Sequence, residues 1–170
     1  MTPPARPGAV FDCMAFLQAT ASPSGPAAAC LRLVEAGAVT LFVSEPVLRE
    51  VGDVLTRPRV RQKNPRLTDE AVQALLERLS QKAVFVGQVP EQFSCARDPK
   101  DEPYVDLAVA AGAAYLVSRD KDLLDLMDEA SSEGVAFRQR FPGLTILDPV
   151  AFLRVMSSKE DESQAEEKSP

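Results

Sequence analysis

Short apolar runs alternate with segments of helical periodicity along most of the chain. The runs predict strands at residues 9–11, 39–43, 83–86, 114–117 and 144–147. Apolar side chains at helical spacing predict helices at residues 26–35, 46–55, 69–82, 103–111 and 150–156. Strands that alternate with helices favour an α/β, three-layer fold, in which helices flank a central parallel sheet of about five strands.

Some stretches depart from this alternation. Residues 57–66 carry five basic residues and no acid, and residues 131–140 follow no clear period.

We expect one domain at residues 9–156, between a disordered N-terminus at residues 1–8 and a disordered acidic tail at residues 157–170. A chain of 170 residues is long enough for one domain with a hydrophobic core.

The sequence also indicates where in the cell the protein is expected. No apolar run approaches the roughly 18 residues that a membrane span needs, and the first residues lack the apolar core and cleavage site of a signal peptide. We therefore expect a cytoplasmic protein that does not bind a membrane. Cys13, Cys30 and Cys95 show no CxxC spacing, so we interpret them as small buried apolar residues.

The absence of histidine excludes several classes of enzyme. Ser-His-Asp triads, Cys-His pairs, imidazole bases and His-ligated zinc are all ruled out. Any catalysis must then depend on carboxylates, lysines, hydroxyls or a hard metal ion. The net charge of −6 weakly disfavours non-specific nucleic-acid binding, but much of it lies in the C-terminal tail and it does not identify a partner.

Carboxylates occur where the predicted strands end and where the next helices begin. They are Asp12 after the first strand, Glu50 in the helix after the second, Asp101 before the helix that leads to the fourth, and Asp120 and Asp122 after the fourth. In a parallel α/β sheet, these positions lie at the carboxyl edge, where ligands bind. The sequence therefore predicts that acids from distant parts of the chain converge there.

Helical angles separate Asp101 from its neighbours. The apolar side chains of its helix are centred near Asp101, whereas Asp106 lies about 140° away. We expect Asp101 to point inward and Asp106 to point toward water. Asp98 precedes Pro99 and is interpreted as an Asx-turn residue.

Converging acids favour a hard cation. Crowded like charges are costly unless a cation neutralises them or they take up protons. Because the chain offers no histidine ligand and no cysteine pair, an all-oxygen site suits Mg²⁺ or Mn²⁺. Local roles are the alternative: Asp12 and Asp120 can cap turns or helices, and Glu50 can simply face solvent.

Four segments resemble the PIN-domain nucleases, most of all the VapC-like toxins of toxin–antitoxin systems. They read FDCMAFL from residue 11, SEPVLREVGDVLTRP from residue 44, DPKDEPYVDLAVAAGAAYLVSRDKDLL from residue 98 and LTILDPVAFL from residue 144. The resemblance covers residues 9–153. It implies a Mg²⁺- or Mn²⁺-dependent endoribonuclease that hydrolyses RNA phosphodiester bonds.

By motif, the resemblance assigns catalytic and metal-binding roles to Asp12, Glu50, Asp101 and Asp120, with Asp122 also close to the metals. It implies a homodimer and a cognate antitoxin protein as partner. One departure concerns Cys13 and Met14, because the family often has a small polar residue and then Asn or Ser after the first acid.

Basic residues near these acids are candidates for RNA backbone contacts. They are Arg57, Arg59, Arg61 and Lys63 in the basic segment, and Arg119 and Lys121 around Asp120. A solvated loop is the simpler interpretation of the basic segment. Two other functions stay open: a PIN-like binding protein with weak catalysis, or a different Mg²⁺-dependent phosphoryl hydrolase that uses Asp12 as nucleophile.

Overall fold

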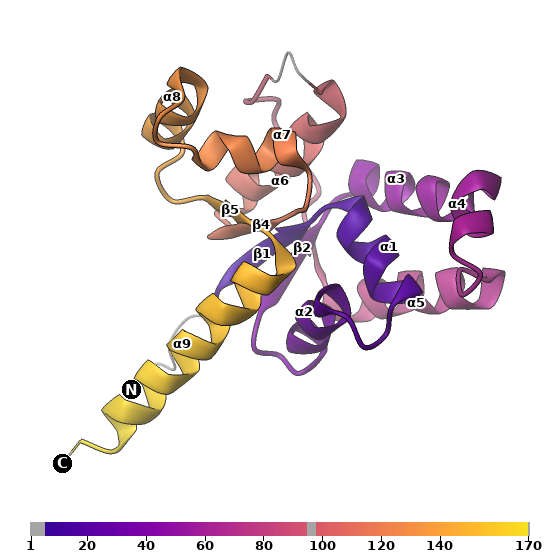
Figure 1. The fold of residues 1–170 in the computed structure, drawn as a ribbon, viewed down its shortest axis with the longest axis horizontal. Helices are drawn as coiled ribbons and strands as arrows, with labels where there is room; N and C mark the ends of the chain where they lie inside the picture. Colours follow the sequence, from indigo (N-terminus) through magenta and orange to yellow (C-terminus); the bar gives the residue numbers. More distant parts are fainter. Residues whose placement is uncertain (1–5, 95–97, 170) are drawn as a thin grey trace.

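A parallel sheet lies at the centre of the protein (Figure 1), and the computed structural model describes residues 6–94 and 98–169. The strands are β1 (Gly8–Phe11), β2 (Thr40–Val43), β3 (Val84–Phe85), β4 (Tyr115–Val117) and β5 (Thr145–Leu147). Their order is β3-β2-β1-β4-β5, and every adjacent pair is parallel. The predicted α/β fold with a five-stranded parallel sheet is confirmed.

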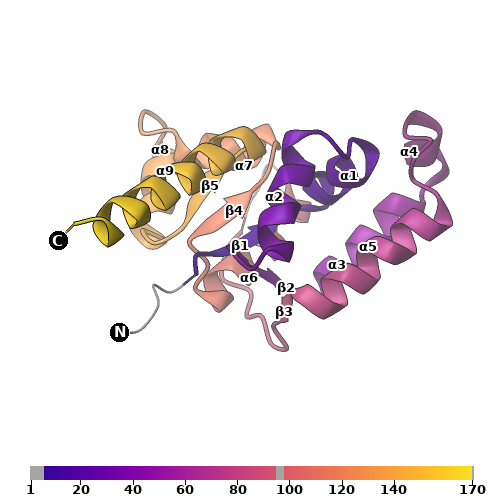
Figure 2. The same ribbon diagram turned by 90° about the horizontal axis from the view of Figure 1, so that it is seen from below.

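Helices connect these strands. In the described part of the chain they are α1 (Cys13–Ala21), α2 (Pro26–Glu35), α3 (Glu45–Thr56), α4 (Pro58–Lys63), α5 (Asp69–Lys82), the 3₁₀ turn η1 (Pro99–Asp101), α6 (Glu102–Ala111), α7 (Lys121–Leu124), the 3₁₀ turn η2 (Asp125–Met127), α8 (Ser132–Arg140) and α9 (Pro149–Glu167). Figure 2 shows α3, α4 and α5 on one side of the molecule and α9 on the other.

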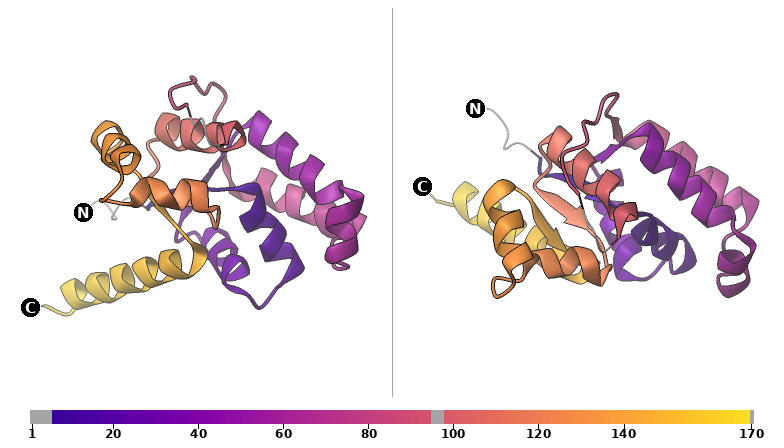
Figure 3. Two further views of the ribbon diagram at one scale, coloured as in Figure 1. Left: turned by 45° about the horizontal axis from the view of Figure 1, so that its top comes forward. Right: turned by 90° about the horizontal axis from the view of Figure 1, so that it is seen from above.

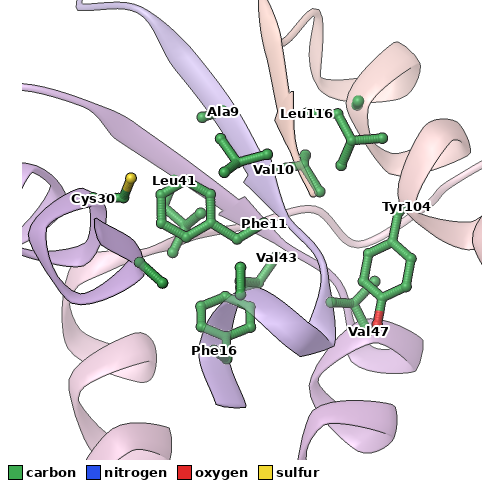
Figure 4. Close-up of a cluster of buried hydrophobic side chains, with 14 of the residues drawn as sticks. Ala9, Val10, Phe11, Phe16, Cys30, Leu41, Val43, Val47, Tyr104 and Leu116 are labelled. Carbon is green, nitrogen blue, oxygen red and sulfur yellow. The ribbon is translucent and has the colours of Figure 1, made fainter. Parts of the chain in front are cut away.

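The sheet is covered on both faces. Helix α6 packs across β1, β2 and β4, while α2 packs against α9 on the opposite face. The Phe11 ring of β1 meets Phe16 of α1 and Phe152 of α9, at centroid distances of 5.8 and 6.1 Å. Figure 4 shows Phe11 and Phe16 on one side of the strands and Tyr104 of α6 on the other. The sheet is thus the middle layer, and helices on its two faces are the outer layers of the predicted three-layer fold.

The sheet also fixes where a ligand can bind. The chain places β2 and β3 on one side of β1, then returns to place β4 and β5 on the other side. The order of strands therefore reverses between β1 and β4, and such a reversal opens a crevice at the carboxyl ends. Gly112 adopts a left-handed conformation (φ 65°) where α6 ends, so the chain turns directly into β4.

Three local expectations are corrected by the structure. The strand expected at residues 83–86 is reduced to Val84 and Phe85 at the sheet edge, both with exposed side chains. The basic segment contains helix α4 rather than only a loop. Residues 132–140, which show no clear period, form α8, because its Phe137 packs against Phe93 from a remote loop. Such tertiary packing is invisible to periodicity.

The acidic tail also differs from the expectation of disorder. Helix α9 continues to Glu167 and projects from the body of the protein (Figure 3). The buried Phe152 and Met156 anchor its first turns, and no glycine or proline interrupts residues 157–167. An anchored helix is extended at low cost by residues of high helix propensity. Most of the N-terminal stretch expected to be disordered, residues 1–5, lies outside the described residues.

No helix in the described ranges is long and apolar enough to cross a membrane. Cys30 is buried, as expected, and Cys13 is half-buried, whereas Cys95 lies outside the described residues.

Candidate metal centre

Asp12 stands at the carboxyl end of β1 and caps the N-terminus of α1. Its Oδ1 accepts a hydrogen bond from the Ala15 N–H at 2.8 Å, and its Oδ2 accepts one from the Ser118 hydroxyl. The side chain is almost fully buried. Burial raises the pKa of Asp12 to about 6; the hydrogen bonds from Ser118 and Ala15 oppose this shift, and the charges of Asp120 and Glu50 add to it.

Asp101 lies where η1 passes into α6, and it points inward as predicted, with 7% of its surface exposed. Its Oδ2 is buried and has no hydrogen-bond partner among the described residues. Burial raises the pKa of Asp101 to about 7, and the nearby charges of Asp120, Asp98, Asp12 and Asp122 add to the shift. A buried carboxylate oxygen without a hydrogen-bond partner lowers the stability of the fold, and binding of a proton or a cation would offset this loss.

Asp98, Asp101 and Asp120 form the tightest group of acids. One carboxylate oxygen of each lies within 4.8 Å of the others. Asp98 makes the expected Asx turn, in which its Oδ1 accepts from the Lys100 N–H at 3.0 Å. The structure therefore places Asp98 with the acids at this edge, whereas the sequence favoured a turn role for it over a metal role.

Asp120 is held in place by a buried hydroxyl between it and Asp12. The Ser118 hydroxyl donates to Asp12, while its oxygen accepts from the Asp120 N–H at 2.9 Å. Ser118 is fully buried just past β4. Ser118 was not among the residues predicted for the site, although a polar residue between an apolar run and an acid was a usable signal. Asp120 also caps α7, since its Oδ1 accepts from the Asp122 N–H at 2.8 Å.

Glu50 comes from α3 and lies near Asp12. It is half-buried, in agreement with its place on the edge of the helix's apolar arc. Its Oε2 accepts a hydrogen bond from the Tyr104 hydroxyl at 2.6 Å, and its charge contributes to the raised pKa of Asp12. Glu50 thus lies near Asp12 but outside the close group of Asp98, Asp101 and Asp120. Asp122 lies at the start of α7, and its charge acts on Asp101.

The basic candidates occupy two places. Arg57 pairs with Asp53 at 2.7 Å and Arg61 with Asp69 at 2.6 Å, so ion pairs already engage both side chains. Arg59 and Lys63 are exposed on α4, and Lys121 is exposed on α7. Arg119 is exposed beside Asp120 and lines a cavity of about 430 Å³, which also contacts Asn64 at the end of α4 and the starts of α2 and α9.

Asp106 corrects a prediction, because it does not point toward water. Its side chain is only 6% exposed. Its Oδ1 accepts hydrogen bonds from the N–H groups of Gln92 and Phe93, at 2.9 and 2.8 Å. The loop after β3 thus folds over the polar side of α6, and a helical angle alone could not reveal this cover.

We expect Asp106→Ala to destabilise the protein by about 2 to 4 kcal/mol, because two loop N–H groups lose a charged acceptor. The free energy of unfolding in urea measures this loss, with the exposed Asp161→Ala in α9 as control. Metal affinity should stay unchanged, since Asp106 lies outside the acidic group. A destabilisation below about 0.5 kcal/mol would show that the loop does not depend on this carboxylate.

The donor set suits a hard divalent cation. Five acids reach the carboxyl edge of the sheet from four separate segments: Asp12, Glu50, Asp98, Asp101 and Asp120. All of their ligand atoms are oxygens, and the buried Oδ2 of Asp101 accepts no hydrogen bond from the residues that the structure describes. Mg²⁺ and Mn²⁺ prefer such ligands. A cation held here would also relieve the repulsion that raises the pKa values of Asp12 and Asp101.

Comparison with known proteins agrees with this geometry. A family model described as PIN domain matches residues 8–122, a range that contains Asp12, Glu50, Asp98, Asp101, Asp120 and Asp122. No curated protein matches the chain.

Proposed function

Because the chain belongs to the PIN-domain family, we propose that it is a Mg²⁺- or Mn²⁺-dependent endoribonuclease. PIN domains are typically metal-dependent nucleases, and an acidic group is present at the expected edge of the sheet. The observation that carries the proposal is the buried, unpartnered Oδ2 of Asp101 beside Asp98 and Asp120. Such an atom is explained by a bound cation better than by a role in folding.

In this proposal, Asp12, Glu50, Asp101 and Asp120 are the catalytic metal ligands, with Asp122 nearby and Asp98 as a further ligand. A divalent cation would supply Lewis acidity at the scissile phosphate and favour attack by water. Ser118 holds Asp12 in one orientation through its hydroxyl. Each oxygen of Asp12 accepts one hydrogen bond and keeps a second lone pair that can bind a cation.

The basic residues offer a path for the RNA backbone. Arg119 adjoins Asp120, and the cavity that it lines extends to Asn64 at the end of α4. We propose that phosphates flanking the cut contact Arg119 and Lys121, then Arg57 just before α4 and Arg59, Arg61 and Lys63 within it. Arg59 and Lys63 are better placed than Arg57 and Arg61, whose charges are already engaged.

The toxin role is a further part of the proposal. It is supported by the resemblance to VapC-like toxins and implies a homodimer in the cytoplasm, restrained by a cognate antitoxin. A small reading frame immediately upstream, whose product binds this protein, would support the role.

We expect the purified chain to cut single-stranded RNA with millimolar Mg²⁺ or Mn²⁺, to stop when a chelator is added, and to spare DNA of the same sequence. Gel analysis of labelled oligonucleotides measures this. Asp12→Asn should cut at least about 100-fold more slowly, while Asp161→Asn, on the exposed part of α9, should match the unaltered chain. Cleavage that persists in chelator, or metal binding without cleavage, would contradict the proposed activity.

A further inference from the structure

Tyr104 links two parts of the proposed metal site. It follows Asp101 by one helical turn on α6 and is almost fully buried, with 2% of its surface exposed. Its hydroxyl donates to Oε2 of Glu50 on α3, at 2.6 Å. Figure 4 shows the ring between the sheet and α3, with the hydroxyl at the Val47 end of the ring. One side chain therefore connects the helix that carries Asp101 to the helix that carries Glu50.

This hydrogen bond limits how Glu50 can act. A half-buried glutamate on a helix surface has several rotamers of similar energy, and ordering it costs entropy. The Tyr104 ring is fixed by packing, so its hydroxyl selects one rotamer before any ligand arrives. Because Oε2 accepts the hydrogen bond from Tyr104, Oε1 is the oxygen better able to bind a cation. A single free oxygen suits Mg²⁺, which binds carboxylates sparingly and in strict octahedral geometry.

Cys13 lies beside this pair of side chains. Its half-buried thiol is close to both Tyr104 and Glu50, whose hydroxyl and carboxylate act on it. The residue that departs from the family pattern is therefore a neighbour of Tyr104 at the edge of the proposed site.

We propose that Tyr104 is a positioning residue, whose hydroxyl holds Glu50 in the orientation that completes the divalent metal site. This inference rests on the proposed function. Tyr104 touches neither metal nor substrate and acts only through Glu50.

The test is Tyr104→Phe, which removes the hydroxyl and keeps the buried ring. We expect about 10-fold weaker Mn²⁺ binding, the usual cost of losing a group that orients a metal ligand. Mn²⁺ titration followed by electron paramagnetic resonance measures the affinity without any need for activity. RNA cleavage should fall at low Mn²⁺ and recover at saturating Mn²⁺, whereas a general structural defect would not recover. Tyr115→Phe is the matched control, because Tyr115 packs on Phe152 away from the acids.

A second variant separates positioning from packing. If Tyr104 acts through Glu50, adding Tyr104→Phe to Glu50→Gln should change Mn²⁺ affinity less than about two-fold. The inference is overturned if Tyr104→Phe binds Mn²⁺ within two-fold of the unaltered chain while Asp101→Asn abolishes binding; the proposed function then survives. If the unaltered chain binds no Mn²⁺, both the inference and the proposed function fail.

Discussion

Asp101→Asn should abolish metal-dependent RNA cleavage and at the same time make the metal-free protein more stable. The two effects have one origin. The Oδ2 atom of Asp101 is buried without a partner, and neighbouring carboxylates surround it. This buried negative charge would favour cation binding, but it lowers the stability of the metal-free fold.

The expected sizes follow from this geometry. Loss of a central ligand should lower the cleavage rate by at least about 100-fold, since groups that merely orient ligands already cost about 10- to 100-fold. Removing the buried charge should raise the free energy of unfolding by about 2 to 4 kcal/mol at pH 8 without metal. For a chain of this size, that is a rise of about 5 to 10 °C in melting temperature. Thermal melts and cleavage assays on the same preparation measure both.

Asp161→Asn removes the same charge from the exposed part of α9 and should change neither quantity. A variant of Asp101 that loses activity and also loses stability would point to a folding role. A variant that cuts RNA at the normal rate would remove Asp101 from the proposed site.

The convergence of acids could be predicted from the sequence because it depends on simple rules. Apolar runs locate the strands, and parallel connections place their carboxyl ends on one edge. Asp12 comes directly after one such run, and Asp120 comes three residues after another. The inward direction of Asp101 followed from helical angles, and the structure places the carboxylate there. Local sequence and topology are sufficient to place these three acids.

Contacts between distant segments could not be obtained in this way. Tyr104 and Glu50 are 54 residues apart, and no periodicity joins them. Asp106 was assigned to the wrong side for a related reason: the loop that covers it has no pattern of its own. Helical angles say which way a side chain points, but not what lies in front of it. For Asp98 the sequence favoured a turn over a metal role, because the Asx turn is local whereas its closeness to Asp120 depends on the fold.

The metal-free protein should lose stability as the pH rises from 5 to 8. The folded pKa values of Asp12, about 6, and Asp101, about 7, both exceed the unfolded value of about 3.9. Between these limits the folded state binds more protons than the unfolded state, so its stability falls with increasing pH. From pH 5 to 8, the two groups together should lower the free energy of unfolding by about 4 kcal/mol. This corresponds to a fall of about 10 °C in melting temperature.

Mg²⁺ or Mn²⁺ should reverse this loss, because a cation replaces the protons as the neutralising charge. We expect millimolar metal to raise the melting temperature strongly at pH 8 and little at pH 5, where protons compete for the same oxygens. Thermal melts across this pH range, with metal and with chelator, measure the difference. Asp101→Asn serves as the comparison, because it removes the contribution of Asp101 and leaves the rest of the chain unchanged.

The direction of the effect discriminates between the two interpretations of the acids. If Asp12 and Asp101 were only caps and helix-dipole partners, they would be stabilising as anions, and the metal-free protein would gain stability as the pH rises. A metal site instead requires anions that destabilise the fold until a cation arrives. Stability that rises from pH 5 to 8 relative to Asp101→Asn, or a melting temperature that metal does not change at pH 8, would contradict the metal centre.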